Sequence, residues 1–219
     1  MRSRALGQLR SVVISALLLG VFAALGTGIV AGIHDLTVTR IAANQRAALL
    51  EQLQAIIPAK RYDNDPVGDT LELAPDPLLG TDGTTRCYRF RRDGQPVAVV
   101  LEVVAPDGYS GPIRLLVGVH RDASIAGVRV VEHRETPGLG DGIEAERSDW
   151  IHTFQGRTLG NPPSDDWEVK PDGGSFDALT GATITPRAVV HAVRDALKYF
   201  RAHREHLLFA EGRAASQGA

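Results

Sequence analysis

Cysteine is almost absent from this chain: Cys87 is the only one among 219 residues. One thiol cannot form an intrachain disulfide, a four-cysteine zinc site or an all-cysteine iron–sulfur cluster, so all three are excluded. Cys87 lies in RCYRF, an alternating stretch typical of a strand, and we predict that it packs in the core. Any electron chemistry of this chain therefore needs an organic cofactor.

Ionisable residues are absent from Ser11 to Ile33, a run of 23 positions that follows Arg2, Arg4 and Arg10. As a helix this run is about 34 Å long, which is enough to cross a hydrocarbon core of about 30 Å. A signal peptide also begins with basic residues, but its apolar region is usually about 7–15 residues and therefore shorter. We predict an uncleaved transmembrane helix at residues 11–33.

The arginines before this run predict its orientation, because basic residues stay on the cytoplasmic side of a bacterial inner membrane. Residues 1–10 would then lie in the cytoplasm and the rest of the chain in the periplasm. Only three of the 24 basic residues precede the run, and all 26 acidic residues follow it. The exported part is therefore acidic and shows no basic patch of the kind that nucleic-acid binding needs. We expect a membrane association and no nucleic-acid partner.

The composition is that of a folded protein, with 43 % hydrophobic and 23 % charged residues, and no internal repeat is visible. Apolar residues at helical spacing continue the first helix as a stalk up to Pro58. Residues 62–86 are rich in proline, glycine and aspartate, which predicts a surface connection with little regular structure.

Strands are predicted for the middle of the chain. RCYRF and PVAVVLEVVA flank Asp93 and Gly94, a strong hairpin signal. GPIRLLVGVHRD and IAGVRVVEHRE flank a short turn at Ala123 and Ser124, which predicts a second hairpin. Strand character ends after Glu132.

The last third of the chain predicts helices. We expect a short helix between Gly142 and Trp150, one more edge strand in WEVKPDGG and a closing helix from Pro186 to about Phe209. The predicted class is α+β, a small antiparallel sheet with packed helices carried by one N-terminal transmembrane helix. Five parts follow: a cytoplasmic N-terminus (1–10), the transmembrane helix (11–33), a helical stalk and connecting segment (34–86), the folded domain (87–210) and a C-terminal tail (211–219).

Three polar loops of the folded domain carry glycine: GYSG at 108–111, ETPGLGDG at 135–142 and LTGATIT at 179–185. The accessible N–H groups of such loops bind anions or flat rings well. Each loop alone is also what an ordinary turn of a β domain looks like. GLGDG lacks the spacing and the helical continuation of a dinucleotide-binding fingerprint, so a Rossmann fold is not predicted.

The third loop leads into the closing helix, whose positive end favours an anion such as a phosphate. Thr185 is a candidate N-cap and Pro186 suits the first helical position. These roles leave four residues of the turn unexplained: Asp177, Thr180, Gly181 and Thr183. No base that would activate a catalytic threonine is evident, and a hydroxyl can also serve passively, as an acceptor that another enzyme modifies.

DALTGAT, residues 177–183, resembles the flavinylation motif D-x-x-S/T-G-A-S/T of FMN-binding domains in Rnf and sodium-pumping NADH:quinone reductase complexes. The order of anchor, stalk, GYSGPIRLLVGV, EHRETPGLGDGIE, SDW and DGGSFDALTGATITPRAVVHAV is similar to that of G subunits of Rnf complexes over almost the whole chain. In this family a separate flavin transferase moves FMN from FAD to the last hydroxyl of the motif. The resemblance implies a phosphoester between FMN and Thr183, and an FMN-binding domain at residues 87–210.

The resemblance also implies a function. The chain would be an electron-carrying subunit of an inner-membrane complex that couples electron transfer between NADH and ferredoxin to ion translocation, with other membrane subunits as partners. It would not be catalytic alone, since it has one expected span and no nicotinamide-binding fold. Two alternatives remain open: a flavinylated domain of another extracytoplasmic electron-transfer system, and a cofactor-free anchored binding or assembly module.

The expected flavin site joins the motif to the other two loops. Its matching motif positions are Asp177, Thr180, Gly181, Ala182 and Thr183, and Leu179 within the same segment is also expected at the site. The expected neighbours of the flavin are Tyr109, Glu135, Thr136, Gly138, Leu139, Gly140 and Lys170. Of these neighbours, Glu135 and Lys170 are explained equally well as solvated charges.

No catalytic residue and no metal site are expected. His203 and His206 lie three residues apart on the closing helix, but no third ligand is evident. Trp150 and Trp167 border helical segments, and we interpret both as core residues rather than as shields for a cofactor ring.

Overall fold

The computed structural model describes residues 2–210, without the side chains of residues 2–13, 15, 16, 33, 35, 36 and 39. It divides into two compact units, Met1–Ala48 and Leu49–Ala219. The predicted C-terminal tail at residues 211–219 lies outside the described residues.

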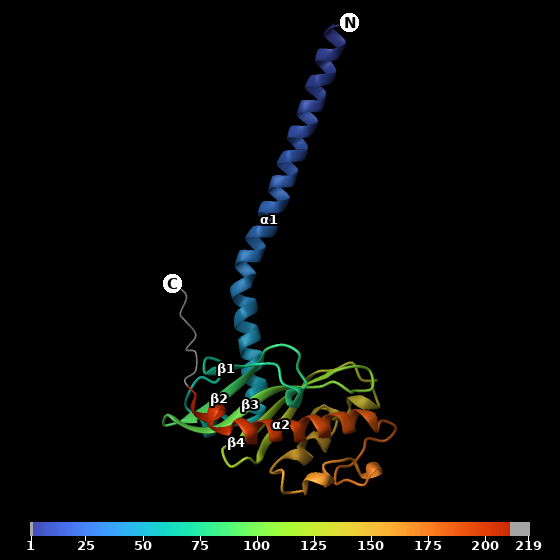
Figure 1. Ribbon diagram of the computed structural model, residues 1–219. Coiled ribbons are helices and arrows are strands. Elements are labelled where there is room, and N and C mark those ends of the chain that lie inside the picture. The colour runs from blue at the N-terminus through green and yellow to red at the C-terminus, as the bar shows by residue number, and fades with distance from the viewer. Residues whose placement is uncertain (1, 211–219) are drawn as a thin grey trace. The chain divides into compact units, whose positions relative to one another are not determined.

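The first unit consists of the long helix α1 (Arg2–Ile56) up to residue 48 (blue in Figure 1). Leu17, Leu18 and Leu19 are all exposed, and because they are consecutive they point to different sides of the helix. No helix in the described part of the chain is both long and apolar enough to cross a membrane. The predicted span at residues 11–33 falls partly on positions without described side chains (11–13, 15, 16 and 33).

The second unit is built on an antiparallel sheet that, within the described residues, has five strands in chain order. They are β1 (Thr70–Leu73), β2 (Thr85–Arg92), β3 (Gln95–Ala105), β4 (Ile113–His120) and β5 (Ile125–Glu132). Both predicted hairpins are present. Asp93 and Gly94 have φ values of 51° and 74°, the left-handed backbone that a two-residue hairpin turn requires. The predicted α+β class with an antiparallel sheet is confirmed.

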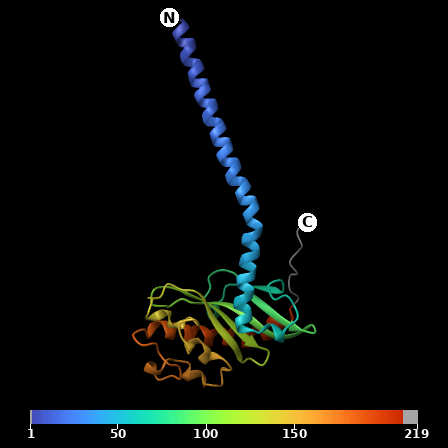
Figure 2. The same ribbon diagram turned by 180° about the vertical axis from the view of Figure 1, so that it is seen from behind.

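Helices cover both faces of the sheet (Figures 1 and 2), and each face carries a hydrophobic core. One face packs against α2 (Ile184–Phe209), where Val99, Val117 and Val189 are completely buried. The other face packs against the last two turns of α1, whose Ile56 is 4 % exposed. Gly118 makes room for this contact, because a Cβ at that position would lie 2.2 Å from Ile56 Cγ2.

The chain between β5 and α2 is held by packed aromatic rings rather than by a regular ladder. Trp150, Phe154, Trp167 and Phe176 form this cluster, and the ring centroids of Phe154 and Phe176 are 4.9 Å apart. Trp150 and Trp167 are 7 % and 0 % exposed, so their interpretation as core residues is confirmed. Cys87 is also completely buried, as predicted.

The connecting segment before β2 is more regular than predicted. It contains β1 and the 3₁₀ helix η2 (Pro77–Leu79), and another 3₁₀ helix, η1 (Ala59–Arg61), directly precedes it. β1 has only four residues, and its alternation is too short to stand out beside the prolines and glycines around it. Its backbone pairs with Thr85–Tyr88 of β2, a long-range partnership that the segment's own sequence does not reveal.

Two predictions after β5 are wrong. The helix expected between Gly142 and Trp150 is replaced by the 3₁₀ helices η3 (Gly140–Ile143) and η4 (Asp149–Phe154). The edge strand expected in WEVKPDGG is reduced to one bridge between Val169 and Phe176, beside η6 (Lys170–Asp172). The edge strand does not continue because the proline inside η6 has no N–H to donate to a strand ladder. A further 3₁₀ helix, η5 (Ser164–Asp166), precedes it.

Candidate functional site

The three glycine-bearing loops meet at one cavity of about 380 Å³. The loop at 108–111 joins β3 to β4, the loop at 135–142 follows β5, and the third loop runs into α2. We call this the three-loop cavity. It is lined by Tyr109, Glu135, Thr136, Leu139, Gly140, Gly181, Ala182, Thr183, Ile184 and Thr185. The structure thus places eight of the predicted site residues around one hollow, together with Ile184 and Thr185.

The start of α2 differs from the prediction. Thr183 occupies the N-cap, whereas Thr185 and Pro186 are the second and third residues of the helix, so their predicted positions are wrong. Pro186 is tolerated because the first N–H groups of a helix have no partner within it. The Thr183 side chain makes no capping hydrogen bond and lines the cavity. Its hydroxyl therefore lies at the positive end of α2, where an attached anion is favoured.

The turn before Thr183 depends on a glycine. Gly181 has φ 79°, a left-handed conformation that residues with a side chain rarely adopt. The N–H of Ala182 donates to the carbonyl of Leu179 across this turn at 3.0 Å. A Cβ at position 181 would also lie 3.1 Å from Leu139 Cδ2. Both backbone conformation and space therefore favour glycine next to the cavity.

Glu135 is buried, so its interpretation as a solvated charge is wrong: the residue is 4 % exposed. One carboxylate oxygen accepts the N–H of Ser110 at 2.9 Å, and the other accepts the hydroxyl of Thr185. Its own N–H donates to Nδ1 of His133 at 3.0 Å. The Glu135 carboxylate thus connects all three loops.

Few backbone donors of the second loop remain for a ligand. The N–H groups of Leu139 and Gly140 both donate to the carbonyl of Thr136, at 3.1 and 3.0 Å. These two N–H groups are consumed by the loop itself, whereas the apolar side chain of Leu139 is 46 % exposed at the cavity.

Three apolar side chains stand exposed around the three-loop cavity. Tyr109 is 67 %, Leu139 46 % and Ile184 43 % exposed. Exposed apolar side chains that gather at a hollow are typical of a binding site. A flat aromatic ligand resting on them would remove this surface from water.

Asp177 and Lys170 lie outside the cavity lining. Lys170 Nζ pairs with the Asp177 carboxylate at 2.5 Å, and both side chains are exposed. The Asp177 carbonyl accepts the indole N–H of Trp150 at 2.6 Å. The structure therefore uses Asp177 to fix the start of the motif loop and does not bring Lys170 to the cavity. Leu179, Thr180 and Gly138 are not lining residues, although Thr180 and Gly138 are each next to one in the chain.

Sequence reasoning missed Ile184 and Thr185 as cavity residues. They are the next two residues after Thr183, and the helix start at this point was interpreted only as a capping signal from Thr185. In the structure Thr185 is 1 % exposed and its hydroxyl is engaged by Glu135.

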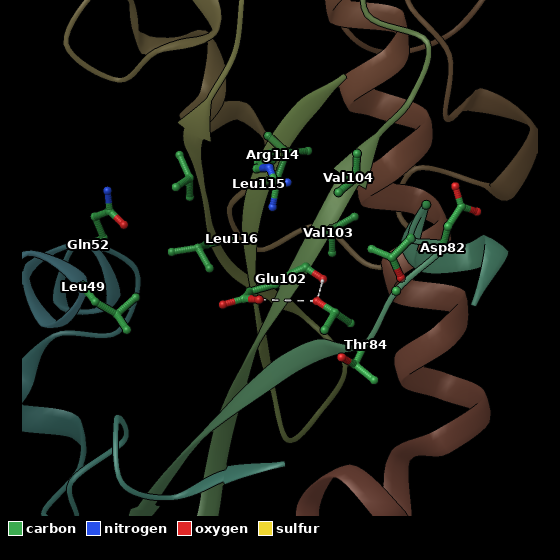
Figure 3. A pocket seen from close by; sticks show the side chains of 15 residues that line it. Leu49, Gln52, Asp82, Thr84, Glu102, Val103, Val104, Arg114, Leu115 and Leu116 are labelled. Carbon is green, nitrogen blue, oxygen red and sulfur yellow. Dashed lines mark hydrogen bonds between the residues drawn. The ribbon is translucent and has the colours of Figure 1, made fainter. Parts of the chain in front are cut away.

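A second cavity, of about 350 Å³, opens on the sheet face that the end of α1 covers (Figure 3). Leu49 and Gln52 of α1 lie opposite Leu116, and Glu102 also lines the cavity. Thr85 donates to the Glu102 carbonyl at 3.1 Å. None of the motif residues lines this cavity, so it is not the site that the motif predicts. Among the described residues, no group of three or more histidine, cysteine or acidic side chains is placed to hold a metal ion.

Residues 108–198 match the family model of the FMN-binding domain, and residues 1–56 match that of the RnfG N-terminal region. The chain is 50 % identical over 208 residues to the G subunit of the ion-translocating oxidoreductase complex of Pseudomonas aeruginosa, covering 95 % of this chain and 97 % of that protein. The chain belongs to the G-subunit family of ion-translocating oxidoreductase complexes. The resemblance read from the motif and from the order of segments is confirmed.

G subunits of other bacteria are also similar over most of their length. Identity is 46 % over 193 residues with the protein of Vibrio cholerae, covering 88 % of this chain and 92 % of that protein. It is 42 % over 201 residues with the protein of Shewanella piezotolerans, covering 92 % and 95 %. The FMN-binding-domain match contains all three loops of the cavity. An FMN group fits the residues present: a free hydroxyl at a helix N-terminus for the phosphate and an exposed apolar rim for the ring.

Proposed function

We propose that this G subunit carries FMN, attached through its phosphate to the hydroxyl of Thr183, and passes electrons within an ion-translocating oxidoreductase complex. One observation carries the proposal. Of the three threonines in the motif loop, Thr183 alone combines a place in the cavity with a side chain that makes no capping bond. The Thr185 hydroxyl is engaged by Glu135, and Thr180 does not line the cavity.

The start of α2 supports a phosphoester at this position. An esterified phosphate keeps negative charge, and the N-terminus of a helix stabilises such a charge by roughly 0.5–2 kcal/mol. Gly181 lets the backbone approach the phosphate without a Cβ in the way. Bound there, FMN supplies one- or two-electron redox chemistry, which the side chains of this chain do not offer.

The rim supports the position of the flavin ring. Tyr109, Leu139 and Ile184 offer exposed apolar surface from all three loops. A ring that rests on them leaves one edge open to a redox partner, because the cavity lies at the surface. The chain's part in the reaction is to hold the ring, orient the phosphate and keep the carrier accessible.

The anchor and the partners complete the proposal. The uncharged run at residues 11–33 would span a bacterial inner membrane once, with the N-terminus in the cytoplasm and the FMN domain in the periplasm. The relatives' name supports other complex subunits as partners. We infer that the complex couples electron transfer between NADH and ferredoxin to ion movement, and that a flavin transferase attaches the FMN.

The experiment is peptide mass spectrometry of the full chain, produced with and without a flavin transferase. With the transferase, the peptide that contains Thr183 gains the mass of an FMN phosphoester, and the denatured protein remains fluorescent. A colourless, unmodified chain from both hosts contradicts the proposal and favours a cofactor-free assembly module. The subunits that copurify with a modified chain distinguish an Rnf-type complex from another extracytoplasmic electron-transfer system.

A further inference from the structure

Glu135 is a buried charge without a counterion. It is 4 % exposed, and in the described part of the chain no ion pair includes it. Burial of a carboxylate is costly unless hydrogen bonds replace its water. The donors that do so are the N–H of Ser110, at 2.9 Å, and the hydroxyl of Thr185. Because burial of this carboxylate costs free energy, we expect Glu135 to have a role other than packing.

The two donors come from the two sides of the three-loop cavity. Ser110 directly follows Tyr109, which stands on the rim. Thr185 is the second residue of α2 and lies two positions after Thr183. The Glu135 carboxylate therefore connects the side that would support the flavin ring to the side that carries the acceptor hydroxyl.

Gly140 shows how closely this connection is packed. A Cβ at position 140 would lie 2.8 Å from Glu135 Cβ and 3.1 Å from both Glu135 Oε2 and Thr185 Oγ1. The second loop therefore covers the Glu135–Thr185 contact directly. Both carboxylate oxygens are bonded to protein groups, and these two bonds support a role for Glu135 in holding the loops together.

We propose that Glu135 is a positioning residue for flavin attachment. Its carboxylate holds the first turn of α2 at a fixed distance from the 108–111 loop, so that a flavin resting on Tyr109 presents its phosphate to the Thr183 hydroxyl. This rests on the proposed function. A displacement of about 1 Å between reacting groups costs about a hundredfold in rate, so a fixed distance between these loops has a large effect.

The connection between the loops depends on the two hydrogen bonds of Glu135 and not on the charge of its carboxylate. In Glu135→Gln the amide oxygen still accepts the Ser110 N–H, and the amide nitrogen donates to the Thr185 oxygen. Glu135→Ala removes both bonds. Thr185→Val removes one bond and leaves a buried carboxylate oxygen without its donor, which is destabilising in itself. The neutral amide is therefore the conservative variant, and the two other variants break the connection.

The test measures covalent FMN per folded full-length chain after production with a flavin transferase. Glu135→Ala and Thr185→Val are expected to lower the covalent FMN per chain by about tenfold or more. Both changes move the Thr183 hydroxyl away from the side of the cavity where Tyr109 would support the flavin ring. The double variant is expected to be no worse than Glu135→Ala, because both changes remove the same contact. Glu135→Gln is expected to restore FMN incorporation to nearly the wild-type level.

A matched control separates positioning from general destabilisation. Val119 is completely buried in β4, near the end of this strand that is farther from the 108–111 loop. Val119→Ala weakens the core and is expected to leave FMN incorporation unchanged. Three results would each overturn the positioning role. They are a loss of FMN in Val119→Ala as large as that in a Glu135→Ala chain of equal thermal stability, a normal amount of FMN in Glu135→Ala, and a failure of Glu135→Gln to restore incorporation.

Amide hydrogen exchange of the protein without FMN tests the Glu135 connection independently of flavin attachment. Without a transferase, Glu135→Ala is expected to speed amide hydrogen exchange at Ser110 and in the first turn of α2, whereas Glu135→Gln is not. Unchanged exchange in Glu135→Ala would overturn the connection itself. Faster exchange in Glu135→Ala, together with a wild-type chain that never accepts FMN, would support the connection and refute only the proposed function.

Discussion

The indole Nε1 of Trp150 donates a hydrogen bond of 2.6 Å to the carbonyl oxygen of Asp177, the first residue of the motif. Trp150 itself packs edge-on against Phe154, with ring centroids 5.3 Å apart. The motif loop is thus fixed to the aromatic cluster at its start and to α2 at its end. A short loop that is held at both ends presents Gly181 and Thr183 in one arrangement.

Trp150→Phe tests the first of these attachments. Phenylalanine keeps most of the ring packing but leaves the Asp177 carbonyl without its donor, which is expected to cost about 1–3 kcal/mol of unfolding free energy. Urea unfolding measures that loss, and FMN incorporation is expected to fall with it. Trp167→Phe is the matched control, because it also loses an indole hydrogen bond, to Pro162 at 3.2 Å, but not one to the motif. Equal FMN loss in both variants would contradict a specific role for the Trp150–Asp177 bond.

Gly181→Val is expected to abolish FMN attachment while the chain still folds. Valine at φ 79° is strained, and its side chain would press on Leu139 beside the proposed phosphate position. Gly156→Val is the control, since Gly156 has nearly the same φ, 77°, with no atom within 4 Å of its added Cβ. It carries the same backbone strain away from the cavity. In-gel flavin fluorescence compares the two, and normal fluorescence in Gly181→Val would show that this turn does not hold the phosphate.

The hairpins and the three loops were predictable from sequence because their signals are local. Asp93 and Gly94 adopt the left-handed turn that this dipeptide favours, and each glycine-bearing loop lies where strand or helix periodicity stops. That the loops meet at a cavity is also consistent with their places at the ends of neighbouring elements. Local chemistry was sufficient for these features.

The long-range features were not predictable in this way. β1 exists because β2 pairs with it, and Thr185 is buried because Glu135, 50 positions away in the chain, accepts its hydroxyl. Local sequence reasoning makes Thr185 a cap and explains Glu135 equally well as a flavin neighbour or as a solvated charge. Hydrogen bonds between distant loops decide both roles, and no period or spacing encodes such bonds.

The end of α1 is expected to belong to the folded domain rather than to a separable stalk. Leu53, Ile56 and Ile57 are 0 %, 4 % and 1 % exposed against the sheet. A chain that starts at Leu49 is expected to unfold cooperatively, whereas one that starts at Ala59 loses about 1.5–3 kcal/mol for each of these three side chains. Thermal unfolding by circular dichroism compares the two. Equal midpoints would show that the helix end contributes nothing to the second core.

Cysteine labelling tests the predicted orientation in intact spheroplasts. Burial raises the pKa of the Cys87 thiol to about 12, so this native cysteine stays protonated, inaccessible and silent. A cysteine at Ser3 is expected to be protected from an impermeant thiol reagent, and one at the exposed Asp82 is expected to react. The reverse pattern would contradict the orientation. A mature chain without its first ~30 residues would instead identify a cleaved signal peptide.

Thr183→Val carries the most weight, because it keeps the shape of the side chain and removes only the hydroxyl. No phosphoester can form on valine, and since the Thr183 side chain makes no capping bond, the helix is expected to remain intact. The expected product is a folded chain without covalent flavin that does not support electron transfer in its complex. Thr183→Ser is expected to retain modification, because the chemistry needs only an oxygen in the cavity.

Thr180→Val is the control, since Thr180 lies outside the cavity lining and its loss is expected to leave the adduct on residue 183. Flavin fluorescence after denaturation, with peptide mass to locate the adduct, measures all three variants, and covalent FMN that persists in Thr183→Val would move the attachment to another hydroxyl.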